Sequence, residues 1–122
     1  MFDFNHPEWD WDGTLAALRC TQLAAGSINT TTATTVYTVP TGKRAIIKFV
    51  TAMNTTNATR DLQMRLNSIG TIWHMQLAAY GSAGDEARVN FWVVLNAGDQ
   101  LKLSTVTAGQ VDYTISGSEH TI

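Results

Sequence analysis

The feature that most constrains this sequence is a series of short runs in which apolar and polar residues alternate. In DLQMRLN, the apolar side chains of Leu62, Met64 and Leu66 share one side of an extended chain. A period of two is typical of a β-strand with one buried and one solvated face. Comparable runs are KRAIIKFVTAM at 43–53, GTIWHMQL at 70–77, ARVNFWVVL at 87–95 and QVDYTIS at 110–116.

Two of these runs require a choice of inner face. In KRAIIKFVTAM, we expect Ile47, Phe49 and Met53 to point into the core. In ARVNFWVVL, Trp92 and Val94 oppose a second apolar set, so we expect this strand to be covered on both sides. The choice matters because a shift of one residue moves every side chain of a strand to the other face of the sheet.

Turn-forming residues separate the runs and define the fold class. Clusters of Gly, Asn, Thr or Pro occupy 40–42, 54–58, 67–70, 81–85, 96–99 and 107–110. Short strands separated by such turns indicate an antiparallel β-sandwich or a jelly roll. Past residue 20 no long segment has the 3.6-residue period of a helix, and β-branched residues dominate. We therefore predict an all-β fold, a jelly-roll-like antiparallel sandwich domain at 20–122 with an extended N-terminal arm at 1–19.

The arm differs in composition from the rest of the chain. Phe2, Phe4, Trp9 and Trp11 stand among acidic residues, and no period of two or seven organises them. Four large aromatics so close together are too many for a free tail, so we predict that the arm docks, with these four residues as its partner-binding anchors. The partner is either the chain's own domain or a neighbouring subunit, and the sequence leaves both open.

Charge and composition exclude several classes of partner. The net charge of −2 and the scattered basic residues argue against a nucleic-acid-binding surface. No stretch approaches the ~20 apolar residues of a membrane-spanning helix. The N-terminus lacks the basic region of a signal peptide, so we expect an unsecreted protein. The single cysteine, Cys20, excludes an intramolecular disulfide and is expected to be a small buried side chain.

The sequence predicts no catalytic, metal or cofactor site. The histidines, His6, His74 and His120, lack the spacing of metal ligands, and His74 is expected on the polar side of its strand. The carboxylates form no convincing pair of the kind that a glycosidase uses. The chain also lacks a Gly-X-Ser-X-Gly elbow and a phosphate-binding loop. We therefore expect that the protein is not an enzyme.

Four further aromatic side chains allow two interpretations. They are Trp73, Tyr80, Trp92 and Tyr113. On an exposed surface they would form a platform that stacks on the apolar faces of sugars. In the core or in a subunit interface they would supply buried area, which is the usual role of aromatics in small β-domains and the one we favour.

Four turn phrases narrow the class of protein. VPTGK at 39–43 opens a long strand, NTT at 54–56 ends it, LNAGDQL at 95–101 precedes a late strand, and ISGSE at 115–119 lies near the C-terminus. This succession, over roughly 35–120, resembles small β-sandwich modules of tailed-bacteriophage virions. The residues that carry the resemblance are Val39, Pro40, Gly42, Lys43, Leu95, Ala97, Gly98, Asp99, Leu101, Ile115, Ser116, Gly117 and Glu119.

The resemblance implies a structural function in a virion. It suggests a capsid decoration (cement) protein, made in the host cytoplasm, that sits on the capsid surface and binds the major capsid protein or other virion proteins. Such subunits assemble symmetrically, so a homo-oligomer, a trimer or a dimer, is expected. The alternative is a tail, fibre or baseplate module that binds a host-surface glycan or other tail proteins, with Trp73 and Trp92 exposed.

Overall fold

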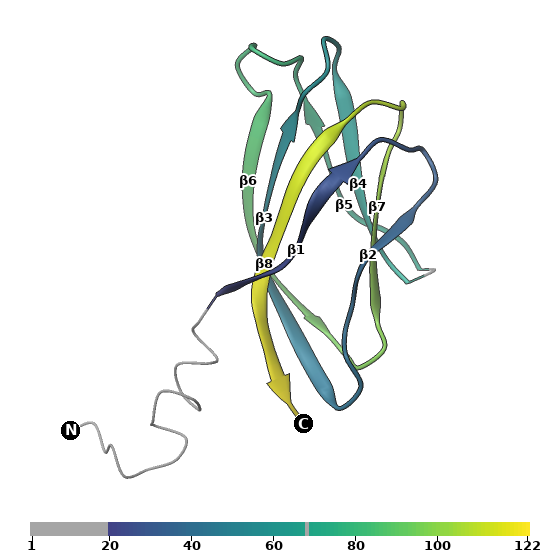
Figure 1. The fold of residues 1–122 in the computed structure, drawn as a ribbon, viewed down its shortest axis with the longest axis vertical. Coiled ribbons are helices and arrows are strands. Elements are labelled where there is room, and N and C mark those ends of the chain that lie inside the picture. The colour runs from purple at the N-terminus through teal and green to yellow at the C-terminus, as the bar shows by residue number, and fades with distance from the viewer. Residues whose placement is uncertain (1–19, 68) are drawn as a thin grey trace, which may run out of the picture.

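Two antiparallel sheets pack face to face in the computed structural model, which describes residues 20–67 and 69–122 apart from the side chain of Phe91 (Figure 1). The chain pairs into two sheets because its strands carry one apolar and one polar face, and the apolar faces leave water together. The strands are β1 (Thr21–Ile28), β2 (Thr34–Thr38), β3 (Lys43–Asn54), β4 (Arg60–Leu66), β5 (Gly70–Leu77), β6 (Glu86–Leu95), β7 (Gln100–Thr105) and β8 (Val111–Thr121).

The strand order is that of a jelly roll. One sheet has the order β1-β8-β3-β6 and the other β2-β7-β4-β5, and every pairing is antiparallel. The chain therefore changes sheet at every connection except the β4–β5 hairpin. This arrangement confirms the predicted fold class. The described part of the chain has no helix long and apolar enough to cross a membrane.

The core lies between the sheets and follows the predicted alternation in most strands. Leu62 and Met64 of β4 are fully buried, and Val111 and Ile115 of β8 are also inaccessible to solvent. Each fully buried aliphatic side chain of this size contributes roughly 1.5–3 kcal/mol. The other buried apolar residues are Ile28, Tyr37, Val39, Ala45, Ile47, Val50, Ala52, Leu77, Leu95, Leu101, Leu103 and Tyr113.

The predicted inner face of β3 is correct only for its first half. Ile47 is buried, but Phe49 and Met53 are only half-buried, and Val50 and Ala52 take the inward positions. The reason is a register shift between Ile47 and Phe49, present against both β6 and β8. Such a bulge adds one residue to the strand and reverses which side chains face the core beyond it.

Two expectations about burial are wrong. The outward side of β6 is not covered, since 64% of Trp92 and 48% of Val94 are exposed. The sandwich has two layers, and the described residues form no third layer over this face. Cys20 is also exposed, because it directly precedes β1 at the edge of its sheet instead of facing the core.

Candidate interaction surface

The four predicted anchors of the arm, Phe2, Phe4, Trp9 and Trp11, lie outside the described residues, so their role stays a prediction. The structure does define where this segment joins the body. It leads into β1, an edge strand of the β1-β8-β3-β6 sheet, and Thr21 pairs there with Gly117.

The outer side of β3 and β6 carries a group of exposed and half-buried apolar residues flanked by cations. Ile46 and Val94 are cross-strand partners, and Trp92 lies two residues before Val94 on the same side. Lys48 places its Nζ atom 5.5 Å from the centre of the Trp92 ring. We call this surface the β3–β6 face; it consists of Ile46, Lys48, Phe49, Arg88, Trp92 and Val94.

The aromatic rings of the β3–β6 face are paired with cationic groups. The Cζ atom of Arg88 lies 5.5 Å from the centre of the Phe49 ring, which repeats the arrangement of Lys48 over Trp92. A cation–π contact at an exposed site is worth about 0.5–1 kcal/mol. Aromatic residues and arginine are the types enriched in protein–protein interfaces, whereas scattered surface apolar residues are ordinary. The composition of this face therefore fits a docking surface.

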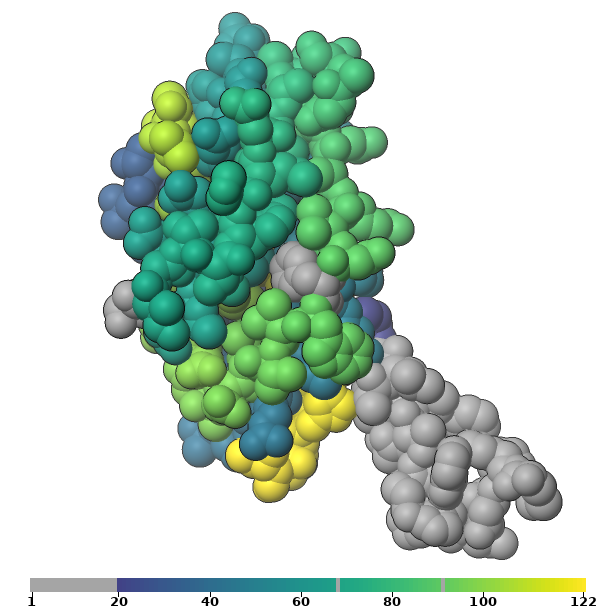
Figure 2. Space-filling view, turned by 180° about the vertical axis from the view of Figure 1, so that it is seen from behind, coloured from purple at the N-terminus to yellow at the C-terminus, as the bar shows by residue number. Residues whose placement is uncertain are grey.

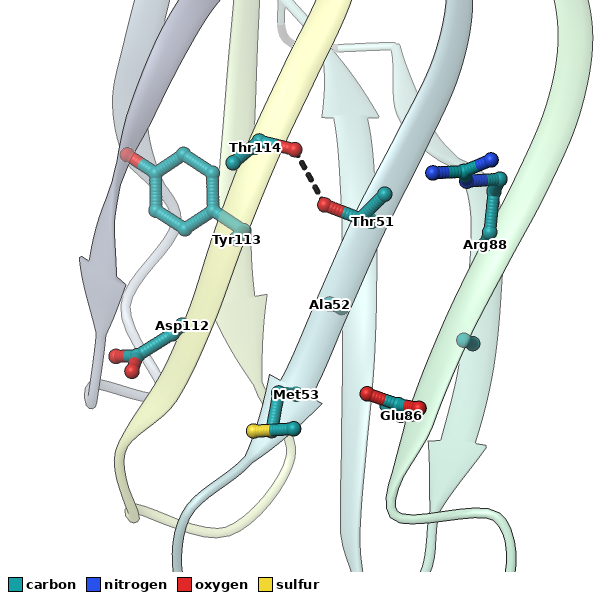
Figure 3. Close-up of a pocket in the computed structure, with 9 residues that line it drawn as sticks. Thr51, Ala52, Met53, Glu86, Arg88, Asp112, Tyr113 and Thr114 are labelled. Atoms are coloured by element: carbon teal, nitrogen blue, oxygen red, sulfur yellow. Dashed lines mark hydrogen bonds between the residues drawn. The ribbon is translucent and has the colours of Figure 1, made fainter.

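A shallow groove of about 510 Å³ adjoins the β3–β6 face across β8, β3 and β6 (Figure 3). Its floor includes Thr51 and Thr114, whose hydroxyl groups hydrogen-bond to each other. Glu86 and Asp112 stand on opposite sides of it, because both pair with Met53 in the sheet. The sequence alone does not pair these carboxylates, because their proximity follows only from the strand register.

Two hydrogen bonds hold one carboxylate of the groove, that of Asp112. Ser27 donates a hydrogen bond of 2.5 Å to Oδ1 of Asp112, and the side-chain amide of Gln110 donates another of 3.0 Å. The hydrogen bond from Ser27 is the largest cause, and the one from Gln110 the second, of a pKa of Asp112 below its ordinary value. Burial has a smaller, opposing effect. Asp112 is thus kept ionised, whereas a general acid needs a raised pKa.

The structure separates three of the four aromatics of the possible sugar platform. Trp73 on β5 is half-buried against the core and lines an apolar slot of about 130 Å³ with Met64, Ile72 and Val93. Figure 2 shows the surrounding strands, with β4 and β5 in teal beside β6 in green. Tyr113 is buried, and Trp92 lies on the outer side of the other sheet. A shared platform of Trp73, Trp92 and Tyr113 is therefore excluded, and Trp73 and Tyr113 pack in the core as favoured.

The histidines of the described chain occupy ordinary positions. His74 is exposed on the polar side of β5, as predicted. His120 is half-buried and hydrogen-bonds through Nε2 to Oγ of Ser118 at 2.9 Å. Within 20–67 and 69–122, no group of three or more His, Cys, Asp or Glu residues gathers into a possible metal site.

Three of the four turn phrases, at 39–43, 95–101 and 115–119, meet at one end of the sandwich, whereas NTT at 54–56 lies at the other end of β3. Val39 donates its amide to the carbonyl of Asp99 and accepts a hydrogen bond from the amide of Gly98, both at 3.0 Å. Lys43 approaches Glu119 to 3.8 Å. The start of the first phrase thus continues the β2–β7 pairing of one sheet, and its end lies beside β8 in the other sheet. The prediction that this phrase forms a structural corner is confirmed.

A buried tyrosine reinforces this corner. The hydroxyl of Tyr37 on β2 donates a hydrogen bond of 2.5 Å to Oε2 of Glu119 on β8, in the opposite sheet. Burial, followed by the hydrogen bond to Glu119 and the charge of that carboxylate, raises the pKa of Tyr37 well above its ordinary value. Tyr37 thus remains a neutral hydrogen-bond donor over the whole physiological range.

The fold and this surface define a jelly-roll domain with an exposed aromatic, cation-flanked sheet face. No known family matches the chain, and no curated protein matches it either. Among solved structures, the Eiger TNF of S. frugiperda is similar at 9% identity over 81% of this chain and 87% of that one, with a TM-score of 0.47. A pentameric capsid protein from metagenomic phage sequences is similar at 17% identity over 97% of this chain and 75% of that one, with a TM-score of 0.45. At these scores, neither likeness indicates a function.

Proposed function

We propose that this chain is a structural protein of a tailed-phage virion, and specifically a capsid decoration protein that binds the shell as a homo-oligomer. The observation that carries the proposal is the β3–β6 face, where Trp92 is 64% exposed beside an exposed Val94 on an otherwise weakly charged domain. A surface with a large exposed aromatic at its centre is suited to protein docking.

The turn phrases support the same proposal. The residues that resemble phage virion modules include Val39, Gly98, Asp99 and Glu119, and in this chain they form contacts at one end of the sandwich. Turn residues that fix the fold define a scaffold, and the outer faces of that scaffold are then available for assembly. We accordingly propose that the chain works through contact area and has no catalytic activity.

Copy number in purified particles tests the proposal. A decoration protein is expected in as many copies as the capsid has equivalent surface positions. Quantitative mass spectrometry of purified particles gives that copy number. A binding assay on undecorated capsids tests whether the protein binds the shell. A protein present in only a few copies, or missing from particles, would contradict a decoration function.

Single substitutions in the β3–β6 face test whether this face is the part of the protein that contacts the capsid. Trp92→Ala removes the centre of the β3–β6 face, and we expect it to weaken capsid binding at least tenfold. Tyr80→Ala is the matched control, because Tyr80 is 63% exposed but lies in the loop between β5 and β6. Equal losses for the two variants would argue against the β3–β6 face as the contact.

Glycan binding by a tail or fibre module remains the second candidate function. The exposure of Trp92 favours it, since an accessible indole can stack on a sugar, and the adjoining groove supplies carboxylates and hydroxyls as hydrogen-bond partners. A glycan array probed with the full chain distinguishes the two. Binding that is lost in Trp92→Ala supports the glycan function, and a blank array removes it.

A further inference from the structure

The charges of the chain are divided unequally between the arm and the body. Residues 1–19 contain four acidic side chains and one basic side chain, which gives a net charge of −3. Residues 20–122 contain six acidic and seven basic side chains, which gives +1, and the two parts sum to the −2 of the whole chain. The acidic residues of the arm also stand next to its aromatic ones, so the segment is both apolar and negative.

The β3–β6 face has the complementary character. It combines Trp92, Val94 and Phe49 with the cations Lys48 and Arg88, each of which lies over an aromatic ring. Arg44 is exposed on the same side of β3, two residues before Ile46. An acidic aromatic segment would cover the exposed apolar area and place its carboxylates beside these cations.

The strand that follows the arm, β1, begins at the height of this face along the sheet. Thr21 pairs with Gly117, Gly117 with Ile47, and Ile47 with Val93, so one line across the sheet leads from the arm to the position between Trp92 and Val94. Three strand spacings amount to ~14 Å. The ten residues from Trp11 to Thr21 span ~15 Å as a helix and ~33 Å when extended, so both conformations suffice.

The residues along this path offer little obstruction. On β8, the outward positions on either side of Gly117 are held by Ser116 and Ser118, whose side chains are small and buried among their neighbours, so they do not project into the path. A segment tethered within reach of its site also meets it at a high effective concentration, in the millimolar range for short linkers. Docking on the same chain is therefore favoured over docking on a second copy.

We propose that residues 1–19 fold back over β8 and dock on the β3–β6 face of their own chain, with Trp9 and Trp11 against the apolar residues and the arm carboxylates beside Arg44, Lys48 and Arg88. The strap covers Trp92 and Val94 in the free subunit. This inference concerns the isolated chain, and it stands or falls independently of whether the protein decorates a capsid.

Photo-crosslinking of the full chain tests the proposal. The crosslinker p-benzoylphenylalanine replaces Trp9, the purified protein is irradiated, and the products are separated by mass before peptide mapping. We expect a product of monomer mass whose crosslinks lie within 44–53 or 86–94. Crosslinks confined to the β2-β7-β4-β5 sheet, the absence of intramolecular crosslinks, or a product found only at dimer mass would each overturn the proposal.

Charge reversal provides the second readout. In the same crosslinker-bearing chain, the double variant Lys48→Glu/Arg88→Glu is expected to lower the yield of that product at least fivefold, and added salt is expected to lower it in the parent. Lys102→Glu, on β7 of the other sheet, is the matched control and should leave the yield unchanged. A yield that is insensitive to both salt and the double reversal would overturn the charge complementarity.

Discussion

Gly117 of β8 lies so close to Ile46 of β3 that a Cβ atom on the glycine would stand 1.9 Å from the Ile46 carbonyl oxygen. The contact is with backbone, so no side-chain rotation relieves it. We predict that Gly117→Ala destabilises the domain by about 3 kcal/mol, at the upper end of overpacking effects. Urea denaturation followed by tryptophan fluorescence measures the loss.

Gly26→Ala is the control for this prediction. Gly26 is on the neighbouring strand β1, and an added Cβ would meet the hydroxyl oxygen of Tyr113 at 3.2 Å, which a small movement of that side chain relieves. We expect a loss below ~1 kcal/mol. If Gly117→Ala lowered the free energy of unfolding as little as Gly26→Ala, the close contact between β8 and β3 at Gly117 would be contradicted.

Asn54 holds three chain segments together from a fully buried position. Its Nδ2 atom lies 2.7 Å from the carbonyl oxygen of Ala58 and 2.9 Å from that of Ala78, and its Oδ1 accepts hydrogen bonds from the amide and hydroxyl of Thr56. Asn54→Asp would turn a donor toward these carbonyls into a buried negative charge. We predict a destabilisation of about 3 kcal/mol at pH 7.

The pH dependence of this variant provides a check. Protonation of the introduced carboxyl restores one donor, so the loss relative to the parent should shrink as the pH falls toward 4. Asn57→Asp, at an exposed position of the same loop, should change stability by less than about 0.5 kcal/mol. A pH-independent penalty for Asn54→Asp would contradict the proposed hydrogen-bond pattern.

Tyr37 makes the stability of the fold depend on pH in the alkaline range. Because burial and Glu119 raise its pKa in the folded state, the folded chain releases this proton at a higher pH than the unfolded chain does. The resulting stability is fully present below the unfolded-state pKa of about 10 and is lost as pH rises toward the folded-state value. Burial raises the pKa of Tyr113 as well, which adds to the decline.

Tyr37→Phe isolates the first contribution. At pH 7 the variant should lose roughly 1.5–3 kcal/mol, the usual value of a hydrogen bond to a charged partner. Above pH 10 its stability should fall less steeply than that of the parent, by ~1.4 kcal/mol per pH unit for one proton. Denaturation curves between pH 7 and 11 measure both quantities, and identical slopes above pH 10 would refute the assignment.

The alternation of the sequence predicted much of the fold because burial on one face forces a period of two. Leu62 and Met64 are therefore inside as expected, and the turn phrase at 39–43 forms the predicted corner. The inward direction of Val50 was not predictable in the same way. A bulge depends on how β3 registers with both neighbouring strands, and no local pattern of residues reports that register.

The candidate surface was harder to foresee than the fold. The apolar character of Trp92 and Val94 indicated that β6 would be covered, but only the strand order places this side of the strand on the outside of a two-layered sandwich. The same holds for Glu86 and Asp112, which lie on either side of Met53 because β6 and β8 both pair with β3. Long-range strand pairing, more than residue type, determined what the sequence alone left open.

Trp92 also allows the docking surface to be separated from the core by experiment. An exposed side chain contributes little to folding, so Trp92→Ala should lower the free energy of unfolding by less than ~1 kcal/mol, apart from the lost contact with Lys48. Trp73→Ala should cost about 3 kcal/mol, because Trp73 packs against the core. Urea denaturation of both variants tests this division. We expect near-parental stability in Trp92→Ala, and a stability loss as large as that of Trp73→Ala would mean that Trp92 supports the fold and is not a docking residue.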